Sequence, residues 1–231
     1  MIPKTIHYCW FGEKEKPALT RKCIESWRKL CPDFTIVEWN EHNFDVALNS
    51  YTKKCYETKQ WAFLSDYIRL IVVFQYGGIY FDTDVEVIRS IDDLLENDAF
   101  FGFENDSFVA TGLGFGAIKK HPSISAMIQQ YEQVINGKFN TVKCPKLNTD
   151  ALIPFGLKCD GSFQVLPNNI TIYPVDYFNP LDDATGRLDI TDNTYSINHY
   201  GKSWLGKGAR IRSKLTRPLH RVLGTDFFRK H

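Results

Sequence analysis

The fold is decided by the stretch Tyr76-Gly77-Gly78-Ile79-Tyr80-Phe81-Asp82-Thr83-Asp84. Residues 79–81 predict a short apolar strand, and the two glycines before them suit a left-handed cap at the end of a helix. Open α/β sheets bind ligands at the carboxyl ends of their strands, so Asp82 and Asp84 indicate a site at that edge. Their hard oxygen donors suit Mg²⁺ or Mn²⁺. The alternative is a solvated turn, in which aspartate is common.

A helix from about residue 59 to residue 76 precedes this strand. Asp66 and Arg69 are three residues apart on it and therefore share one face. They predict either a weak, exposed ion pair or a pair held against the site. The apolar residues around them, Leu70, Ile71 and Phe74, are compatible with the second interpretation, and the sequence alone leaves both open.

The rest of the chain predicts a single α/β domain. Residues 5–11, 19–30 and 34–39 indicate a strand, a helix and a strand, which suggests a βαβ unit and a parallel sheet. Strands are also expected at 99–103 and 113–118, and a helix is expected from Pro122. Beyond Asn140 the pattern is irregular, with prolines separating short strands.

Composition excludes several classes of protein. The 231 residues are 43% hydrophobic and 24% charged, which is ordinary for a globular protein and excludes general disorder. No run approaches the ~20 apolar residues needed to span a bilayer, and the N-terminus does not resemble a secretory signal. The six cysteines form no C-x-x-C pair, so we expect buried, reduced thiols and a cytoplasmic protein.

The basic residues are concentrated near the C-terminus. From Lys202 to His231 there are nine Lys and Arg residues against one acidic residue, so the rest of the chain is acidic. Residues 206–231 also place leucines at helical spacing between the bases, which favours peripheral contact with an anionic membrane surface. The alternative is a helix docked on the domain. No recognised nucleic-acid-binding module is present, so binding to nucleic acid is not expected.

Two segments together resemble glycosyltransferase family 32. Residues 62–69 match A-x-x-S-D-x-x-R, and residues 76–84 match Y-G-G-I-Y-x-D-x-D at the spacing of that family. Residues 2–12 resemble its opening I-P-K-x-I-H-x-x-W-x-G, residues 116–122 its mid-domain strand, and residues 199–204 its H-x-x-x-S-W motif. The resemblance extends from residue 2 to residue 204 and is thin between 140 and 193.

The resemblance implies a GT-A type, Rossmann-like nucleotide-sugar-binding fold with a central, mostly parallel sheet, over residues 1–205. It implies a divalent cation, Mn²⁺ or Mg²⁺, with Asp82, Asp84 and His199 as ligands. Trp10 would stack on the nucleotide base, with a core tryptophan as the alternative. The remaining donor-binding residues implied are Asp66 and Arg69, which are also the catalytic candidates, together with Asp82, Lys202, Ser203 and Trp204.

The activity so implied is retaining transfer of a hexose from a nucleotide-sugar to a saccharide acceptor, in the synthesis of a surface polysaccharide. A UDP-sugar is the expected donor and GDP-mannose the alternative. A lipid-linked acceptor would place the enzyme at the inner face of the plasma membrane. No catalytic nucleophile stands out, and Asn148, Asp150 and Asp106 are weak candidates.

Two other functions are compatible with parts of the sequence. Phe81 to Val85 also resembles the D-x-D loop of aspartyl-nucleophile phosphohydrolases, but Glu86 stands where that pattern has Thr or Val. A non-catalytic nucleotide-sugar-binding module would leave Asp84 and His199 without a role. Release of nucleoside diphosphate, of phosphate or of neither product distinguishes the three hypotheses.

Overall fold

A computed structural model describes residues 1–136 and 143–201 of the chain. The basic segment 206–231 and the predicted donor contacts Lys202, Ser203 and Trp204 lie outside these ranges. Among the described residues, no helix is long and apolar enough to cross a membrane.

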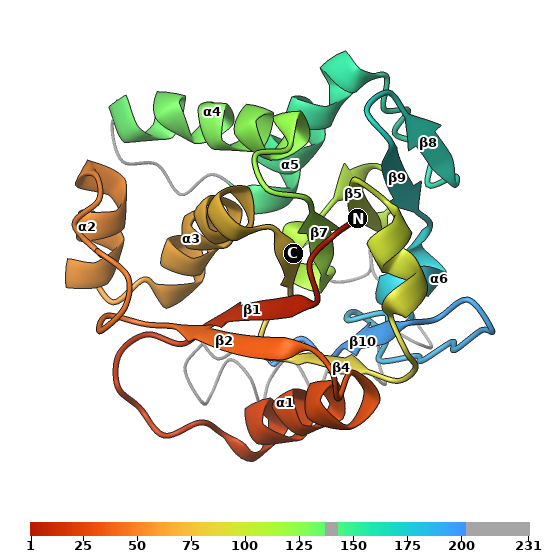
Figure 1. Cartoon of the computed structure of the whole chain (residues 1–231), viewed down its shortest axis with the longest axis horizontal. Coiled ribbons are helices and arrows are strands. Elements are labelled where there is room, and N and C mark those ends of the chain that lie inside the picture. Colours follow the sequence, from red (N-terminus) through yellow and green to blue (C-terminus); the bar gives the residue numbers. More distant parts are fainter. Residues whose placement is uncertain (137–142, 202–231) are drawn as a thin grey trace, which may run out of the picture.

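The centre of the molecule is an eight-stranded sheet in the order β2-β1-β3-β7-β5-β9-β8, with β6 paired to β5 (Figure 1). Strands β2, β1, β3, β5 and β9 run in one direction, while β7, β8 and β6 run in the other. The predicted α/β fold with a mostly parallel sheet is therefore confirmed. The bounds of these strands are β1 Thr5–Cys9, β2 Thr35–Trp39, β3 Gly78–Tyr80, β5 Ala99–Asn105, β6 Phe108–Val109, β7 Phe115–Ala117, β8 Gln164–Leu166 and β9 Ile170–Tyr173.

Helices cover both faces of the sheet. Helices α3 and α4 lie on one side of β1 and α1 lies on the other (Figure 1). Two 3-10 turns are also used below, η1 at Asp92–Glu96 and η2 at Thr111–Leu113. The α-helices are α1 Ala18–Leu30, α2 Ser50–Glu57, α3 Trp61–Tyr76, α4 Pro122–Asn136, α5 Cys144–Leu152 and α6 Val175–Phe178.

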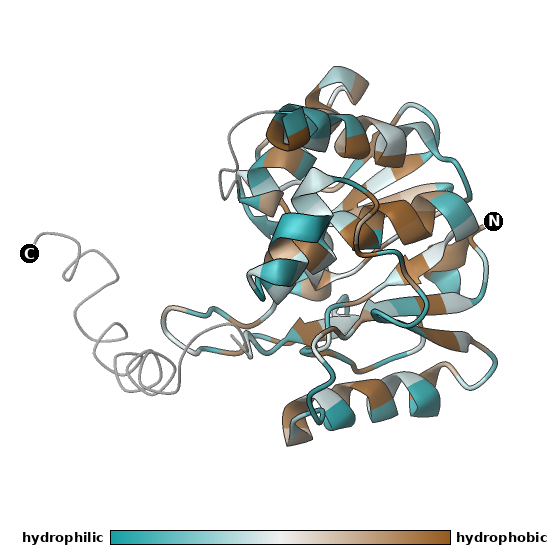
Figure 2. Ribbon diagram, turned by 90° about the vertical axis from the view of Figure 1, so that its left-hand side faces the viewer, coloured by the Kyte–Doolittle hydropathy of each residue, from teal (hydrophilic) through white to brown (hydrophobic). Residues whose placement is uncertain are grey.

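Each face of the sheet has its own hydrophobic core. One core joins α3, α4 and α5 to strand residues such as Phe101 and Phe115, whose rings stack with centroids 5.9 Å apart. The other lies under α1, where buried Trp27 packs on Tyr8 and Phe81. Hydrophobic residues accordingly follow the strands and inner helix faces, and hydrophilic ones the outside (Figure 2). These cores fix the strands whose ends carry the site.

The turn from α3 into β3 needs its two glycines. Gly77 has a φ of +68° and Gly78 a φ of +107°, conformations that side chains with a Cβ rarely adopt. A Cβ on Gly78 would also stand 2.7 Å from the carbonyl oxygen of Thr5. The turn reverses the chain, so that β3 runs back alongside α3. The carboxyl end of β3 therefore lies beside the first half of α3.

A separate two-stranded ribbon, β4 (Val85–Val87) with β10 (Ser196–Asn198), follows that end of β3. The strands are antiparallel, with Asn198 opposite Val85 and Ile197 opposite Glu86. The ribbon therefore brings a segment more than a hundred residues downstream back to Asp84.

Some elements differ from those predicted. Helix α5 stands where we expected only short strands, and Pro145 occupies its first turn, where proline is well tolerated. Helix α2 was also not predicted, and Asn49 and Thr52 form a capping box at its start. The strand expected at 113–118 is shorter, because η2 and Gly114, whose φ is +127°, precede β7.

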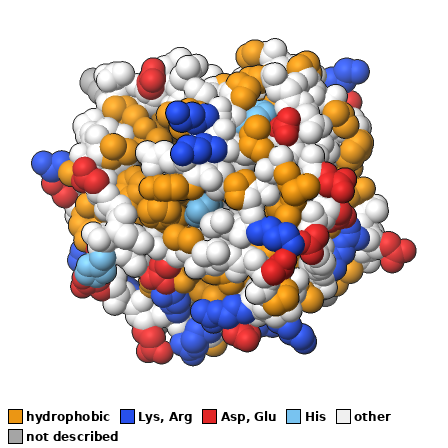
Figure 3. Space-filling model, in the orientation of Figure 1, with side chains coloured by type: hydrophobic (Ala, Val, Ile, Leu, Met, Phe, Trp, Pro, Cys, Tyr) orange, Lys and Arg blue, Asp and Glu red, His pale blue; other side chains and the backbone are white. Residues whose placement is uncertain are grey.

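The cysteines are free, as predicted, and five of the six are buried, whereas Cys159 is exposed. At the surface, acidic and basic side chains alternate around a central hydrophobic area on the face shown in Figure 3. Ion pairs such as Lys4–Asp92, at 2.9 Å, join opposite charges at the surface.

Candidate functional site

The candidate site lies at the carboxyl edge of β1 and β3. The two strands are parallel, and His7 pairs with Tyr80, so Cys9 and Trp10 end beside Phe81 and Asp82. Strand β7 runs the other way, which places the residues before it, in η2, at the same edge. Three separate segments therefore meet where the sequence predicted a ligand site.

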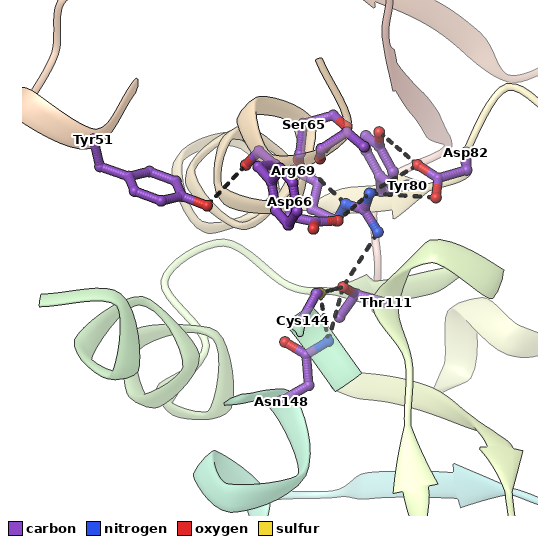
Figure 4. A network of polar contacts seen from close by, with 11 residues as sticks. Tyr51, Ser65, Asp66, Arg69, Tyr80, Asp82, Thr111, Cys144 and Asn148 are labelled. Atoms are coloured by element: carbon purple, nitrogen blue, oxygen red, sulfur yellow. Dashed lines mark hydrogen bonds and ion pairs between the residues drawn. The ribbon is translucent and has the colours of Figure 1, made fainter. Parts of the chain in front are cut away.

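Arg69 is the centre of this site. Its side chain is only 3% exposed, and its Nη2 lies 2.8 Å from Oδ1 of Asp66 and 3.0 Å from Oδ1 of Asp82. Its Nε donates to the carbonyl oxygen of Ser65 at 3.2 Å. Figure 4 shows the guanidinium between the two carboxylates. The second interpretation of the Asp66–Arg69 pair, an ion pair held against the site, is therefore correct.

Tyr80 supports the same pair from β3. Its hydroxyl donates to Oδ1 of Asp82 at 3.1 Å, and the guanidinium carbon of Arg69 lies 5.0 Å from the centre of its ring. The ring face attracts the cation, and the hydroxyl holds the carboxylate. Tyr80 thus fixes both partners of the ion pair.

A second group of polar side chains approaches Arg69 from the far side (Figure 4). Oγ1 of Thr111 lies 3.5 Å from Nη1 of Arg69 and accepts from Nδ2 of Asn148 at 3.0 Å. The same amide lies 3.1 Å from Sγ of Cys144. Oδ1 of Asn148 is buried and has no partner among the described residues. A buried acceptor without a partner is costly, which suggests an unfilled position for a donor group.

Gly112 makes the site close-fitting. A Cβ at this position would lie 2.5 Å from Oδ2 of Asp82 and 3.0 Å from Nη1 of Arg69. The backbone of η2 therefore lies directly on the ion pair, at a distance that only glycine allows.

Among the residues that the structure describes, this site holds more negative than positive charge. Asp66 and Asp82 pair with the buried cation of Arg69, and Asp84 stands close by. Burial raises the pKa of Asp82 to about 7, although Arg69 acts against this, and neighbouring Asp84 and Asp66 add to it. Burial likewise raises the pKa of Asp66 and of Asp84. For Arg69, burial acts to lower the pKa, but the carboxylates of Asp82 and Asp66 outweigh it and raise it.

Asp84 is held by backbone groups from the end of β10. The amide of Gly201 donates to its Oδ2 at 2.7 Å, and the amide of His199 donates to its carbonyl oxygen at 2.9 Å. Tyr200, between them, has a φ of +48°, and this left-handed residue turns Gly201 toward the carboxylate.

His199 is paired with Glu86 on the neighbouring strand. Its Nε2 lies 2.7 Å from Oε2 of Glu86, and Nζ of Lys22 lies 2.7 Å from the same oxygen. Burial raises the pKa of Glu86, but the hydrogen bonds from Lys22 and His199 outweigh burial and lower it below its usual value. The role of His199 as a metal ligand stays a prediction.

Trp10 lies half-buried at the carboxyl end of β1. Its Nε1 donates to the carbonyl oxygen of Lys14 at 2.7 Å, and Nζ of Lys16 stands 5.7 Å from its ring centre. It also packs against the hydrophobic core under α1. Trp10 therefore has the predicted position at the end of a strand and also a structural contact with the core.

The donor set suits a divalent cation in its chemistry and charge. Carboxylate oxygens are the ligands that Mg²⁺ and Mn²⁺ prefer, and the surplus of carboxylates over cations is what such an ion offsets. As they stand, no three His, Cys, Asp or Glu side chains of the described part of the chain converge on one point. Asp82 and Asp84 are the residues that fit the ion; His199 is engaged by Glu86.

Residues 17–101 match the profile of the family described as "Glycosyltransferase sugar-binding region containing DXD motif". That range contains Asp66, Arg69, Asp82 and Asp84. This part of the chain is similar to the family 32 glycosyltransferases, as the sequence motifs indicated. Trp10 and His199 lie outside the matched range.

The chain also resembles curated fungal proteins. An inositol phosphoceramide mannosyltransferase 3 of Schizosaccharomyces pombe is 27% identical over 136 residues, 55% of this chain and 36% of that protein. Inositol phosphoceramide mannosyltransferase 2 of the same organism is 23% identical over 235 residues, 98% of this chain and 65% of that protein. The chain thus spans from about a third to about two thirds of the length of these relatives.

Among solved structures, the glycosyltransferase PaToxG aligns with a TM-score of 0.54 and 19% identity, over 66% of this chain and 68% of that one. This likeness concerns the fold, and it confirms the GT-A type α/β architecture that the family resemblance implied.

The site contains residues that sequence reasoning missed. Thr111, Gly112 and Cys144 had no local signal, whereas Tyr80 stood inside the quoted motif. Of the weak nucleophile candidates, Asn148 lies in the network. Asp150 instead pairs with Lys146 at 2.6 Å, and Asp106 is exposed.

Proposed function

We propose that this chain transfers a hexose from a nucleotide-sugar to a hydroxyl acceptor with the help of a divalent cation, Mn²⁺ or Mg²⁺. The observation that carries the proposal is the charge imbalance at the carboxyl edge of β3. Among the described residues, Asp66 and Asp82 share the buried guanidinium of Arg69, Asp84 stands close by, and burial raises the pKa of each carboxyl. The match to a DXD sugar-binding region supports it.

The side chains take separate roles in this proposal. Asp84 would ligate the cation. Asp82, which also pairs with Arg69, would be a second ligand of the same cation. When bound, the ion supplies positive charge against the diphosphate that leaves the sugar. Arg69 keeps Asp66 and Asp82 at fixed positions, and Asp66 is then placed to accept hydrogen bonds from the hydroxyls of the donor sugar.

The remaining donor contacts follow from the edge of β1 and the end of β10. Trp10 offers an aromatic face at the strand end for the nucleotide base. Oδ1 of Asn148 offers a buried acceptor for a donor group of the ligand. On the basis of the sequence motif alone, we also propose that the diphosphate contacts Lys202, Ser203 and Trp204.

The stereochemistry we propose is retention. None of the three carboxylates around Arg69 is free of a structural partner: Asp66 and Asp82 bind the guanidinium, and Asp84 accepts from Gly201. A carboxylate engaged in this way is a poor nucleophile, so within a retaining reaction direct transfer on the face that the diphosphate leaves is favoured over a covalent intermediate.

The donor and acceptor are proposed from the relatives' names. Several relatives are called inositol phosphoceramide mannosyltransferases, which favours GDP-mannose over the UDP-hexose expected from the sequence. The same names favour the head group of a lipid as acceptor, in line with the predicted lipid-linked acceptor. The basic segment 206–231 would then meet the anionic membrane surface.

A product assay tests this function. The purified chain is incubated with Mn²⁺ and either GDP-mannose, UDP-glucose or UDP-galactose, and the released nucleotide and phosphate are measured separately. We expect release of nucleoside diphosphate from one donor, and its loss on chelation with EDTA. Release of inorganic phosphate would instead support the phosphohydrolase. Stabilisation by a donor without turnover would support a binding module.

A further inference from the structure

The ion pair between His199 and Glu86 sits on a particular face of the β4–β10 ribbon. In the register of the ribbon Asn198 is opposite Val85, so one residue further His199 comes opposite Asp84. The hydrogen bond from the His199 amide to the Asp84 carbonyl, 2.9 Å long, confirms this continuation. Directly opposed residues of an antiparallel pair have Cβ atoms about 4.5–5.5 Å apart on one face.

Glu86 shares that face. Side chains two residues apart in a strand point the same way, so Glu86 lies on the same side of the ribbon as Asp84. His199 is then opposite Asp84 and diagonal to Glu86. The observed contact, 2.7 Å from Nε2 to Oε2 of Glu86, shows which neighbour takes one of its nitrogens.

The hydrogen bond also determines the tautomer of His199. An ionised carboxylate only accepts hydrogen bonds, so Nε2 must carry the proton. In the neutral ring Nδ1 then keeps its lone pair. Nδ1 has no hydrogen-bond partner among the residues that the structure describes, so its lone pair is not used by any of them.

Lys22 also holds Glu86. It belongs to α1, and its Nζ lies 2.7 Å from the oxygen that accepts from His199. The glutamate side chain is 18% exposed and the lysine side chain 58% exposed. Three segments distant in the sequence, α1, β4 and the end of β10, are thus joined through one carboxylate.

We propose that Glu86 is a positioning residue, which holds His199 in the Nε2–H tautomer and leaves Nδ1 to ligate a divalent cation shared with Asp84. Lys22 keeps Glu86 in place for this task. This inference rests on the metal dependence of the proposed function. It specifies that the metal ligand His199 is oriented by a carboxylate, an arrangement found for many metal-binding histidines.

The first measurement uses the metal-free full-length protein. The ¹⁵N chemical shifts of the His199 ring report its tautomer in wild type, in Glu86→Ala and in Glu86→Gln. We expect the Nε2–H form to dominate in wild type, to mix with the Nδ1–H form in Glu86→Ala and to be partly restored in Glu86→Gln, which keeps an acceptor oxygen. An unchanged tautomer in Glu86→Ala overturns the proposal.

The second measurement is the binding of Mn²⁺ in the presence of GDP or UDP, followed by electron paramagnetic resonance. Loss of an outer carboxylate of this kind typically weakens metal binding about 10–100-fold, and we expect that loss in Glu86→Ala. Lys22→Met, at an exposed position that tolerates change, should weaken Mn²⁺ binding less. Glu25→Ala is the matched control, because it removes an exposed carboxylate of α1 that pairs with Arg28.

The outcomes separate the two proposals. If wild type binds Mn²⁺ and both Glu86→Ala and Lys22→Met bind it equally well, the positioning role is wrong and the proposed function stands. If wild type binds no Mn²⁺ with either nucleotide, the proposed metal dependence is wrong, and so is this inference. Should Glu86→Ala fail to fold, Lys22→Met and Glu86→Gln still decide the question.

Discussion

Nη2 of Arg69 lies 3.0 Å from Oδ1 of Asp82, although a turn of two glycines separates the helix of one from the strand of the other. Because Gly77 and Gly78 reverse the chain so tightly, thirteen residues of sequence separation become one buried ion pair. The pair links α3, which lies in one core, to the strand end where the DXD carboxylates begin.

Replacing Asp84 tests the proposed metal ligand. We expect Asp84→Ala to lower turnover of the donor by about 100-fold or more, because a lost ligand removes several kcal/mol of charge stabilisation at the departing diphosphate. Mn²⁺-dependent nucleotide binding should be lost with it, while the circular dichroism spectrum is retained. Asp150→Ala, which removes a carboxylate paired with Lys146 on the surface of α5, is the control. Near-normal turnover of Asp84→Ala would rule out direct ligation.

Arg69 should be required for stability as well as for binding. Arg69→Met leaves Asp66 and Asp82 without their buried cation, and breaking a buried pair in this way costs about 3–5 kcal/mol. Unfolding in urea at pH 7 measures this cost.

Two further variants show whether charge is the cause. Adding Asp82→Asn to Arg69→Met should recover part of the stability, because the unpaired carboxylate is then removed. Arg28→Met, whose guanidinium pairs with Glu25 at 3.4 Å on an exposed helix face, should change stability by less than about 0.5 kcal/mol. A loss of stability below about 1 kcal/mol in Arg69→Met would contradict the central role of this residue.

Which contacts of this site can be predicted from the sequence depends on how far apart in the sequence the contacting residues are. Asp66, Arg69 and Asp82 could be predicted because helix periodicity and one glycine turn, both local, bring them together. Thr111, Gly112 and Cys144 could not, because they reach Arg69 through the pairing of β3 with β7 and the packing of α5, which no local pattern encodes. The same limit applies to Glu86. Its partners Lys22 and His199 lie 64 and 113 residues away in the sequence.

Gly112 offers a steric test of the ion pair. Its φ does not lie in the left-handed region, so Gly112→Ala adds a methyl group without backbone strain. That methyl group would lie 2.5 Å from Oδ2 of Asp82 and must displace the carboxylate. Overpacking of this kind costs about 1–3 kcal/mol, and we expect a lower melting temperature together with weaker nucleotide-sugar binding. An unchanged dissociation constant for the donor would show that the carboxylate can move without consequence.

The last prediction concerns His7, the histidine of the opening motif. It is 2% exposed, its Nε2 lies 2.8 Å from the carbonyl oxygen of Gly77, and Nε1 of Trp39 donates to its Nδ1 at 3.1 Å. The ring is therefore neutral, with the proton on Nε2, and burial lowers its pKa. A histidine in the unfolded chain has a pKa of about 6.5. As the pH falls below that value, the unfolded state takes up a proton that the native state does not, so the contribution of His7 to stability is lost.

Asp66, Asp82 and Asp84, whose pKa values are raised, act in the opposite sense, so a variant is needed to isolate His7. We expect His7→Gln to be less stable than wild type at pH 7.5 and to lose less stability on acidification from pH 7 to pH 5. Urea unfolding at each pH measures this slope. His42→Gln, which changes an exposed histidine whose side chain is 75% accessible, should keep the slope of the wild type. If His7→Gln kept that slope too, His7 would not be the neutral, buried histidine that couples the Gly77 turn to the edge strand β2.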